Sequence, residues 1–271
     1  MSQSQAIVAA DWEACDSKLH ELEAENSSSL SGVWFRGLPN AEWKLTTTLE
    51  RRRESPFSVE EYYQLMRKTL PVAEAFAGHT QTMPEWSEPG DSFGQYFRTM
   101  PAFGYLAYLR HHGFPSPLMD WSRSPYIAAY FAFAKANVTG AEKVAIFAYS
   151  ETPNNQKSNA TNQPHICTHG GMALKTHARH FRQQSCYTVC VQRCDGRKRP
   201  WRLASHQTVF DLGRPGQDRL YKIEVPAAER TKVLNLLEKF NLTEFSLFGS
   251  EESLMESMAF QWIDRDAKQG T

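Results

Sequence analysis

Residues 111–134, HHGFPSPLMDWSRSPYIAAYFAFA, join a polar turn to a strongly apolar segment. Ser124 and Pro125 predict the start of a helix, because a Ser hydroxyl caps free N–H groups and Pro suits the first helical position. The residues that follow leave almost no polar face, which predicts a buried helix. Helix starts attract anions, so the turn carrying Asp120 and Ser122 is a candidate binding site. The alternative is that these two side chains only cap and brace the turn.

Composition is that of an ordinary globular protein. The chain has 271 residues, of which 41% are hydrophobic and 12% aromatic, enough for a sizeable core. Basic and acidic residues balance, so no overall charge directs the chain to nucleic acid or to an anionic membrane. The longest apolar run, around 125–134, is too short to span a bilayer. The first residues lack the basic and apolar segments of a secretory signal, so we expect a cytoplasmic protein.

The five cysteines predict reduced thiols rather than disulfides. Cys186, Cys190 and Cys194 follow one another at equal spacing, with several histidines upstream, but no Cys-x-x-Cys pair is present. The spacing suits one face of an extended strand better than a tetrahedral zinc site. We therefore expect no metal ligands.

Helical and strand patterns divide between the two parts of the chain. Apolar spacing predicts helices over 11–25, 59–76, 93–110, 125–134, 228–240 and 251–263. Alternation and β-branched residues predict strands over 32–37, 143–149, 185–192, 206–212 and 220–225. The segments 78–90 and 150–164 are expected to be loops, 193–202 a basic hairpin tip, and 245–248 a turn. The predicted fold is α+β, with a helical N-terminal half packed on a mixed, mainly antiparallel β core.

Several separated motifs resemble those of the FRG domain. They are Trp34-Phe35-Arg36-Gly37, Trp43-Lys44-Leu45, His111-His112-Gly113-Phe114-Pro115 with Leu118-Met119-Asp120-Trp121-Ser122, Arg179…Gln183-Gln184…Tyr187-Thr188, and Lys222-Ile223-x-Val225-Pro226 through Ser246-Leu247-Phe248. The resemblance implies a domain over residues 30–268, preceded by a helix and linker over 1–29. It also implies a bacterial or phage-borne protein.

The FRG domain in turn resembles, more remotely, the ADP-ribosyltransferase fold, and this implies NAD as a substrate rather than a tightly bound cofactor. In that fold a first-strand Arg or His binds the dinucleotide, a second strand with a Ser or Tyr leads into an apolar helix, and a third strand presents a catalytic Glu. The residues implied in NAD binding are Arg36, Gly37, Trp121, Ser122, Arg179, Gln184 and Tyr187. Those implied in catalysis are His112, Asp120 and Gln183.

One departure leaves two functions open. Gln183 and Gln184 stand where a transferase would place its Glu, and Gln supplies no charge to stabilise a positive ribose. The first hypothesis is an NAD-consuming toxin or phage-defence effector, an ADP-ribosyltransferase or NAD hydrolase. In it Asp120 replaces the missing charge, or His112 is the base for a protein or nucleic-acid acceptor. The second is a catalytically silent module that binds a nucleotide or dinucleotide as a sensor or regulator.

Two further points bear on the site. Pro117 stands where many FRG domains have Arg, which removes one phosphate contact. Arg36 follows three large apolar residues, so it must meet a ligand phosphate, a carbonyl or a carboxylate, and Asp120 is the candidate for a structural ion pair.

Overall fold

The computed structural model describes residues 4–26, 32–53, 56–77, 83–87, 102–151, 163–170, 174, 176–193, 200–212 and 218–265. Within these residues, eight strands form one sheet in the order β1-β8-β4-β2-β3-β6-β5, and β7 pairs with β6. Among the described pairings, β1 and β8 run parallel and the others are antiparallel. The predicted α+β class with a mixed, mainly antiparallel sheet is therefore confirmed.

The sheet consists of two parts that meet at one place. Its strands are β1 (Ser4–Val8), β2 (Val33–Leu38), β3 (Met119–Ser122), β4 (Lys143–Ser150), β5 (His165–His169), β6 (Ser185–Arg193), β7 (Trp201–Leu203) and β8 (Arg219–Pro226). β2 pairs with β3 at a single register position, Phe35 opposite Ser122. We call β1, β8, β4 and β2 the β4 half, and β3, β6, β5 and β7 the β6 half.

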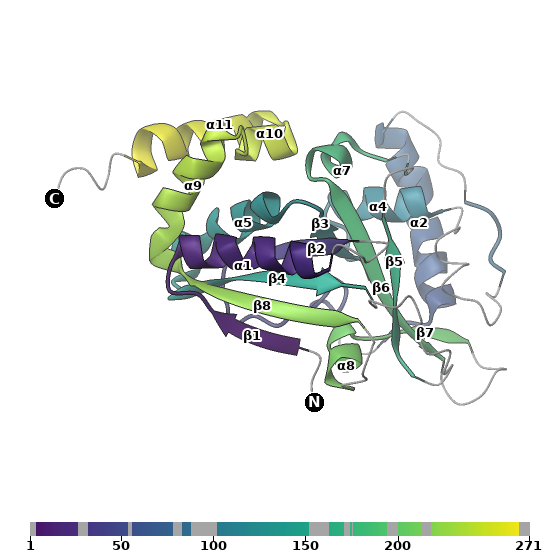
Figure 1. Cartoon of the computed structure of the whole chain (residues 1–271). Helices are drawn as coiled ribbons and strands as arrows, with labels where there is room; N and C mark the ends of the chain where they lie inside the picture. Colours follow the sequence, from purple (N-terminus) through teal and green to yellow (C-terminus); the bar gives the residue numbers. More distant parts are fainter. Residues whose placement is uncertain are drawn as a thin grey trace.

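Most helices lie against one face of the sheet, and one short helix packs against the other (Figure 1). They are α1 (Trp12–Glu25), α2 (Val59–Ala77), α4 (Phe103–His111), α5 (Pro125–Phe133), α6 (Ala136–Thr139), α7 (Ala178–Arg182), α8 (His206–Asp211), α9 (Arg230–Lys239), α10 (Glu244–Phe248) and α11 (Glu251–Ala259), with the short helices η1 (Ala227–Glu229) and η2 (Phe260–Asp264). Apolar side chains of α1, α5 and α9 form one core cluster with β2, β4 and β8. Those of α2 and α4 form a second with β5, β6 and β7.

The apolar segment found in the sequence is the buried helix α5. Ser124 caps it by accepting a hydrogen bond from the Ile127 N–H at 3.3 Å, and Pro125 occupies its first turn. Seven of its residues are buried, and it lies across β2 in the β4 half. The prediction of a buried helix is therefore confirmed for this segment.

Three local predictions were wrong. Residues 119–122 form strand β3 rather than a turn, because their backbone pairs with β6 at every position. Residues 206–212 contain helix α8 rather than a strand: His206, Val209 and Phe210 are buried at helical spacing, which outweighs the strand preference of Thr208 and Val209. Residues 245–248 lie in helix α10, which Thr243 starts with a capping box.

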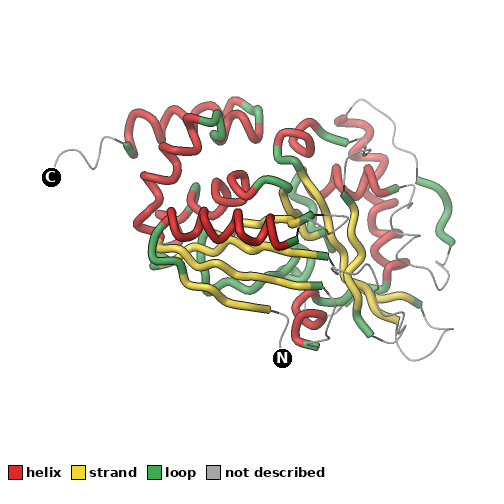
Figure 2. The backbone as a smooth tube through the Cα atoms, viewed as in Figure 1, coloured by secondary structure: helices red, strands yellow, loops and turns green. Residues whose placement is uncertain are grey.

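Other segments were predicted in part. β1 and β5 had not been anticipated, since both are short strands without clear alternation. Figure 2 distinguishes the helices, strands and loops by colour. In the chain, α4 precedes β3, and residues 112–118 connect them. Most of 78–90, residues 93–101, 152–162 and the tip at 194–199 lie outside the described residues, although β6 and β7 pair as the predicted hairpin requires. No helix in the part of the chain with described structure combines the length and apolar character needed to cross a bilayer.

Candidate functional site

The junction of β2 and β3 is where the two halves of the sheet separate. Beyond the single pair of Phe35 and Ser122, β2 continues along β4 and β3 continues along β6. Arg36, the next residue of β2, donates from Nη1 to the main-chain carbonyl of Asp120 at 2.7 Å. Where the backbone pairing of β2 with β3 ends, the Arg36 side chain thus donates the hydrogen bond that a backbone N–H would otherwise donate to Asp120.

Asp120 lies among three arginines. Its Oδ2 is 2.6 Å from Nη2 of Arg110, in the last turn of α4. Its Oδ1 is buried and has no hydrogen-bond partner among the described residues. Burial lowers the pKa of Arg36 to about 10; the Asp120 charge opposes this, while Arg110 and Arg51 lower the pKa further. The pKa of Arg51 is lowered by partial burial and by Arg110, with Asp120 again opposing.

This cluster carries an excess of positive charge. Three guanidinium groups, of Arg36, Arg51 and Arg110, lie near two carboxylates, of Asp120 and Glu50, so about one positive charge is uncompensated. Guanidinium groups bind phosphates with paired N–H donors, and their attraction is stronger where water is partly excluded. The cluster therefore has the chemistry of a phosphate-binding site. The unpartnered Oδ1 of Asp120 is an acceptor suited to a hydroxyl group.

Three side chains beside Asp120 are joined to one another by hydrogen bonds. On β6, Tyr187 is opposite Asp120 and fully buried. Its hydroxyl lies 2.7 Å from Nε2 of His111 and 2.7 Å from Nδ1 of His180. Because the hydroxyl has one proton, it can donate to one neutral imidazole while it accepts from the other. The three side chains can therefore pass a proton along the chain by switching donors and acceptors.

The charges of these groups depend on their burial. Burial lowers the pKa of His111 to about 4, although the neighbouring Asp120 charge acts in the opposite direction. Burial, followed by the Asp120 charge, raises the pKa of Tyr187. At neutral pH the imidazole of His111 is therefore neutral and Tyr187 is protonated.

The other predicted residues are distributed around this junction. His112 is exposed beside Tyr108 and 5.0 Å, ring to ring, from His177. Arg179 donates to the carbonyl of His111 at 3.2 Å and lies over the ring of Phe248. The structure thus brings Arg36, Asp120 and Tyr187 together, while His112 stays at the surface.

Three predicted residues have evident packing roles. A Cβ at Gly37 would lie 1.9 Å from the carbonyl oxygen of Ala128, so Gly37 lets α5 approach β2. Ser122 Oγ donates to the carbonyl of Gln183 at 2.9 Å and accepts from the Ser124 N–H. Trp121 points to the other face and donates to Thr188 Oγ1 at 2.8 Å.

The two glutamines lie at the turn before β6. Gln183 donates from its amide to the carbonyl of Leu247 at 3.3 Å. Gln184 is exposed, with a left-handed backbone (φ 48°). Neither has a carboxylate to stabilise charge, but Gln183 is fastened through its carbonyl to Ser122, which connects this turn to β3.

Four residues of the site were missed in the sequence. Arg110, not Arg36, makes the ion pair with Asp120 that had been expected for Arg36. Arg51, His111 and His180 were also passed over. Arg110 directly precedes the His pair, and this position on the last turn of a helix leading into the motif was the available signal. Nothing in the sequence distinguishes Arg51 from its two arginine neighbours.

One comparison with known protein families matches part of the chain. Residues 31–140 match the FRG domain. No curated protein and no solved structure matches the chain. The matched FRG region runs from β2 to α6 and contains all three arginines and Asp120, whereas Tyr187, His180 and the two glutamines lie beyond it. The wider boundaries 30–268 stay a prediction, and β3 of the FRG region pairs with β6 outside it.

No metal centre is evident in the described part of the chain. No group of three or more His, Cys, Asp or Glu side chains there is arranged to hold a metal ion. The four described cysteines, Cys15, Cys167, Cys186 and Cys190, are buried.

Proposed function

We propose that the junction of β2 and β3 binds the phosphates of a nucleotide, with NAD as the ligand. The observation that carries the proposal is the excess of positive charge made by Arg36, Arg51 and Arg110 around Asp120. Each phosphate of a dinucleotide carries a negative charge, so its pyrophosphate complements this excess. Arg36 would contact the phosphates between β2 and β3, and Arg51 would contact them at the more exposed end of the site.

We further propose that the protein cleaves NAD, as an ADP-ribosyltransferase or NAD hydrolase acting as a toxin or phage-defence effector. The bond between nicotinamide and the ribose carbon breaks, and its electron pair leaves with nicotinamide. The ribose then carries positive charge until water or an acceptor hydroxyl attacks and loses its proton. Asp120 would stabilise that charge, since an oriented carboxylate acts strongly where water is excluded.

His111, rather than the exposed His112, is the better candidate for the proton acceptor. It lies beside Asp120 and Tyr187, and its imidazole is neutral in the free protein. The phosphates of a bound ligand would raise its pKa and make it a better base. Ser122 is already engaged with Gln183 and Ser124, which favours a role in bracing β3 over direct contact with the ribose.

The order of the three motif segments supports the comparison with the ADP-ribosyltransferase fold. Arg36 lies on β2, Ser122 on β3, and the two glutamines directly precede β6, and these strands are neighbours in the sheet. The alternative, a nucleotide-binding module without chemistry, is favoured by Gln183 and Gln184. The two readings share the phosphate site and differ only in turnover.

Nicotinamide release from NAD by the purified protein tests the enzyme reading. Asp120→Asn keeps the shape of the side chain but removes its charge, and we expect turnover to fall by about 100-fold. Circular dichroism of the variant checks that loss of the Arg110 ion pair has not unfolded it. A wild type that releases no nicotinamide, with or without candidate acceptors, leaves the binding module as the function. Release that is unchanged in Asp120→Asn removes Asp120 from the mechanism.

A further inference from the structure

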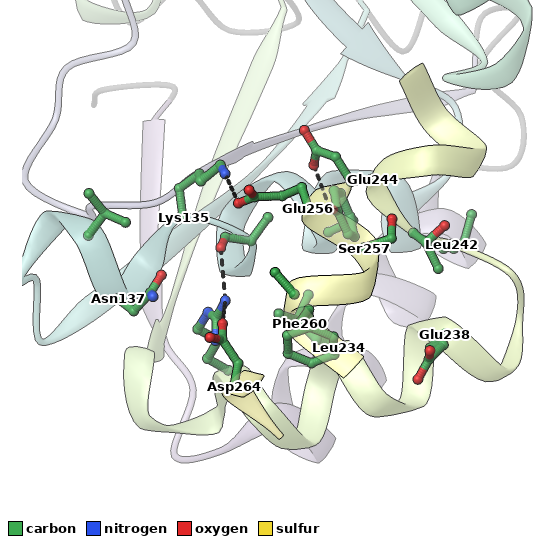
Figure 3. Close-up of a pocket in the computed structure, with 16 residues that line it drawn as sticks. Lys135, Asn137, Leu234, Glu238, Leu242, Glu244, Glu256, Ser257, Phe260 and Asp264 are labelled. Atoms are coloured by element: carbon green, nitrogen blue, oxygen red, sulfur yellow. Dashed lines mark hydrogen bonds and ion pairs between the residues drawn. The ribbon is translucent and has the colours of Figure 1, made fainter. Parts of the chain in front are cut away.

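A cavity of about 260 Å³ lies away from the β2–β3 junction (Figure 3). It is enclosed by the end of α5, by α6, and by the C-terminal helices α9, α10, α11 and η2. None of the predicted site residues is among the described residues that line it. The cavity is therefore independent of the phosphate site and has no role in the function proposed above.

Most charges in the wall of the cavity are already paired. The pairs are Lys135 with Glu256, Arg230 with Asp264 at 3.0 Å, and Glu238 with Arg265. Figure 3 shows the pair of Lys135 and Glu256 as a dashed contact. These six groups cancel one another, so they give the cavity no net charge.

Glu244 is the exception. Its Oε2 accepts a hydrogen bond of 2.6 Å from the hydroxyl of Tyr130, and no cation pairs with it among the described residues. Burial and the Glu244 carboxylate raise the pKa of Tyr130, so the hydroxyl remains the donor. Glu244 is half-buried and lines the cavity, so one negative charge faces the cavity without a counter-charge.

The end of α5 adds to this negative potential. The last carbonyls of a helix carry partial negative charge, and basic residues near them usually compensate it. The last turn of α5 contains no basic residue, and Arg230 reaches only the carbonyl of Ala134, at 3.3 Å. A cation in the cavity would therefore be favoured both by Glu244 and by the helix end.

Part of the remaining lining is apolar. Leu234 is almost fully buried, and Leu242, Val138 and Phe260 extend this surface. The volume is below the roughly 300–1,000 Å³ typical of sites for drug-sized ligands, which indicates a small molecule. A small apolar body with one positive charge complements this apolar part of the lining and the charge of Glu244.

We propose that this cavity binds a small primary amine, with its ammonium group on Glu244 and its apolar body between Leu234, Leu242 and Phe260. Isothermal calorimetry with phenethylamine tests the proposal, and 2-phenylethanol serves as the neutral probe of similar size. We expect the amine to bind and the alcohol to bind at least about tenfold more weakly, because only the amine forms a charged hydrogen bond.

Two variants separate charge from volume. Glu244→Gln keeps an acceptor for Tyr130, and we expect it to weaken binding of the amine by about 30-fold or more. Glu251→Gln is the matched control, since Glu251 is exposed at the start of α11 and does not line the cavity; its affinity should be that of the wild type. Ala259→Phe adds bulk to the wall and should abolish binding of both probes, while circular dichroism reports an intact fold.

Three results would overturn the proposal. They are no binding of phenethylamine to the wild type at millimolar concentration, equal binding of amine and alcohol, and equal loss in Glu244→Gln and Glu251→Gln. Each result is independent of NAD, because no residue of the phosphate site is changed. The amine site and the nucleotide site can therefore fail separately.

Discussion

The β4 half and the β6 half of the sheet are stabilised by different kinds of interaction. In the β4 half, β4 is buried over seven of its eight residues and packs with α1, α5 and α9 through apolar side chains. In the β6 half, Asp120, Tyr187 and His180 lie in or beside the core and need polar partners. Burying such groups costs free energy unless every hydrogen bond is made, and Oδ1 of Asp120 makes none. Apolar packing accounts for the buried residues of the β4 half, whereas the β6 half contains buried polar groups that packing does not require.

The largest effect is expected where the halves meet. Gly37→Val would place side-chain atoms into the backbone of α5, because a Cβ there would already lie 1.9 Å from the Ala128 oxygen and 2.5 Å from the Ala132 nitrogen. We expect a loss of at least about 3 kcal/mol in the free energy of unfolding, measured by urea denaturation. Gly170→Ala is the control, since its nearest neighbour is an arginine side chain at 3.4 Å. Equal stability of the two variants would show that α5 does not depend on Gly37.

The second effect is a pH dependence that belongs to the β6 half. The pKa of His111 is lowered to about 4 in the folded protein, so the unfolded chain takes up its proton first as the pH falls. Stability should decline from about pH 6.5 to about pH 4 by on the order of 3 kcal/mol from this group. His206, whose pKa burial lowers to about 3, adds a decline of the same sign.

The variant His111→Gln should flatten this pH dependence, as measured by thermal unfolding across that range. His20→Gln is the control, because the His20 side chain is 56% exposed on α1. If the slope between pH 6.5 and 4 is the same in wild type and His111→Gln, His111 is not held in its neutral form by burial.

A smaller effect is expected from the hydroxyl of Tyr187. Tyr187→Phe removes a hydrogen-bond partner of both His111 and His180, and we expect the free energy of unfolding to fall by about 1–3 kcal/mol. Tyr105→Phe is the matched control in the same apolar cluster, where the hydroxyl forms a hydrogen bond with Thr69; it should cost about 1 kcal/mol. Equal costs from chemical denaturation would mean that the shared hydrogen bond adds nothing to the stability of the β6 half.

The difference between the halves also explains which features the sequence predicts. The helix over 125–134 and the strand over 143–149 follow from local apolar patterns and caps, and both are confirmed. Strand β3 was taken for a turn because its identity depends on pairing with β6, which is more than sixty residues away in the chain. Local composition does not encode such a contact.

The site was predicted in the same uneven way. Arg36 and Asp120 stood out as charged residues among apolar neighbours, and the structure places them together. Arg51 and Arg110 did not, because each is an ordinary surface-type residue until the fold brings it to Asp120. His111 and His112 are equivalent in the sequence; only the end of α4 decides that His111 meets Tyr187 while His112 faces solvent.

The central claim is that the arginine cluster at the β2–β3 junction binds the phosphates of NAD. Calorimetric titration of NAD into wild type, Arg51→Gln and Arg52→Gln tests it most directly. Both substitutions remove one positive charge from neighbouring exposed residues, and the charges of Arg110 and Asp120 act on the pKa of Arg51. We predict that NAD binds the wild type, that Arg51→Gln weakens it by about tenfold, and that Arg52→Gln leaves it unchanged. Equal affinities of the two variants, or no binding of NAD to the wild type, would contradict the account.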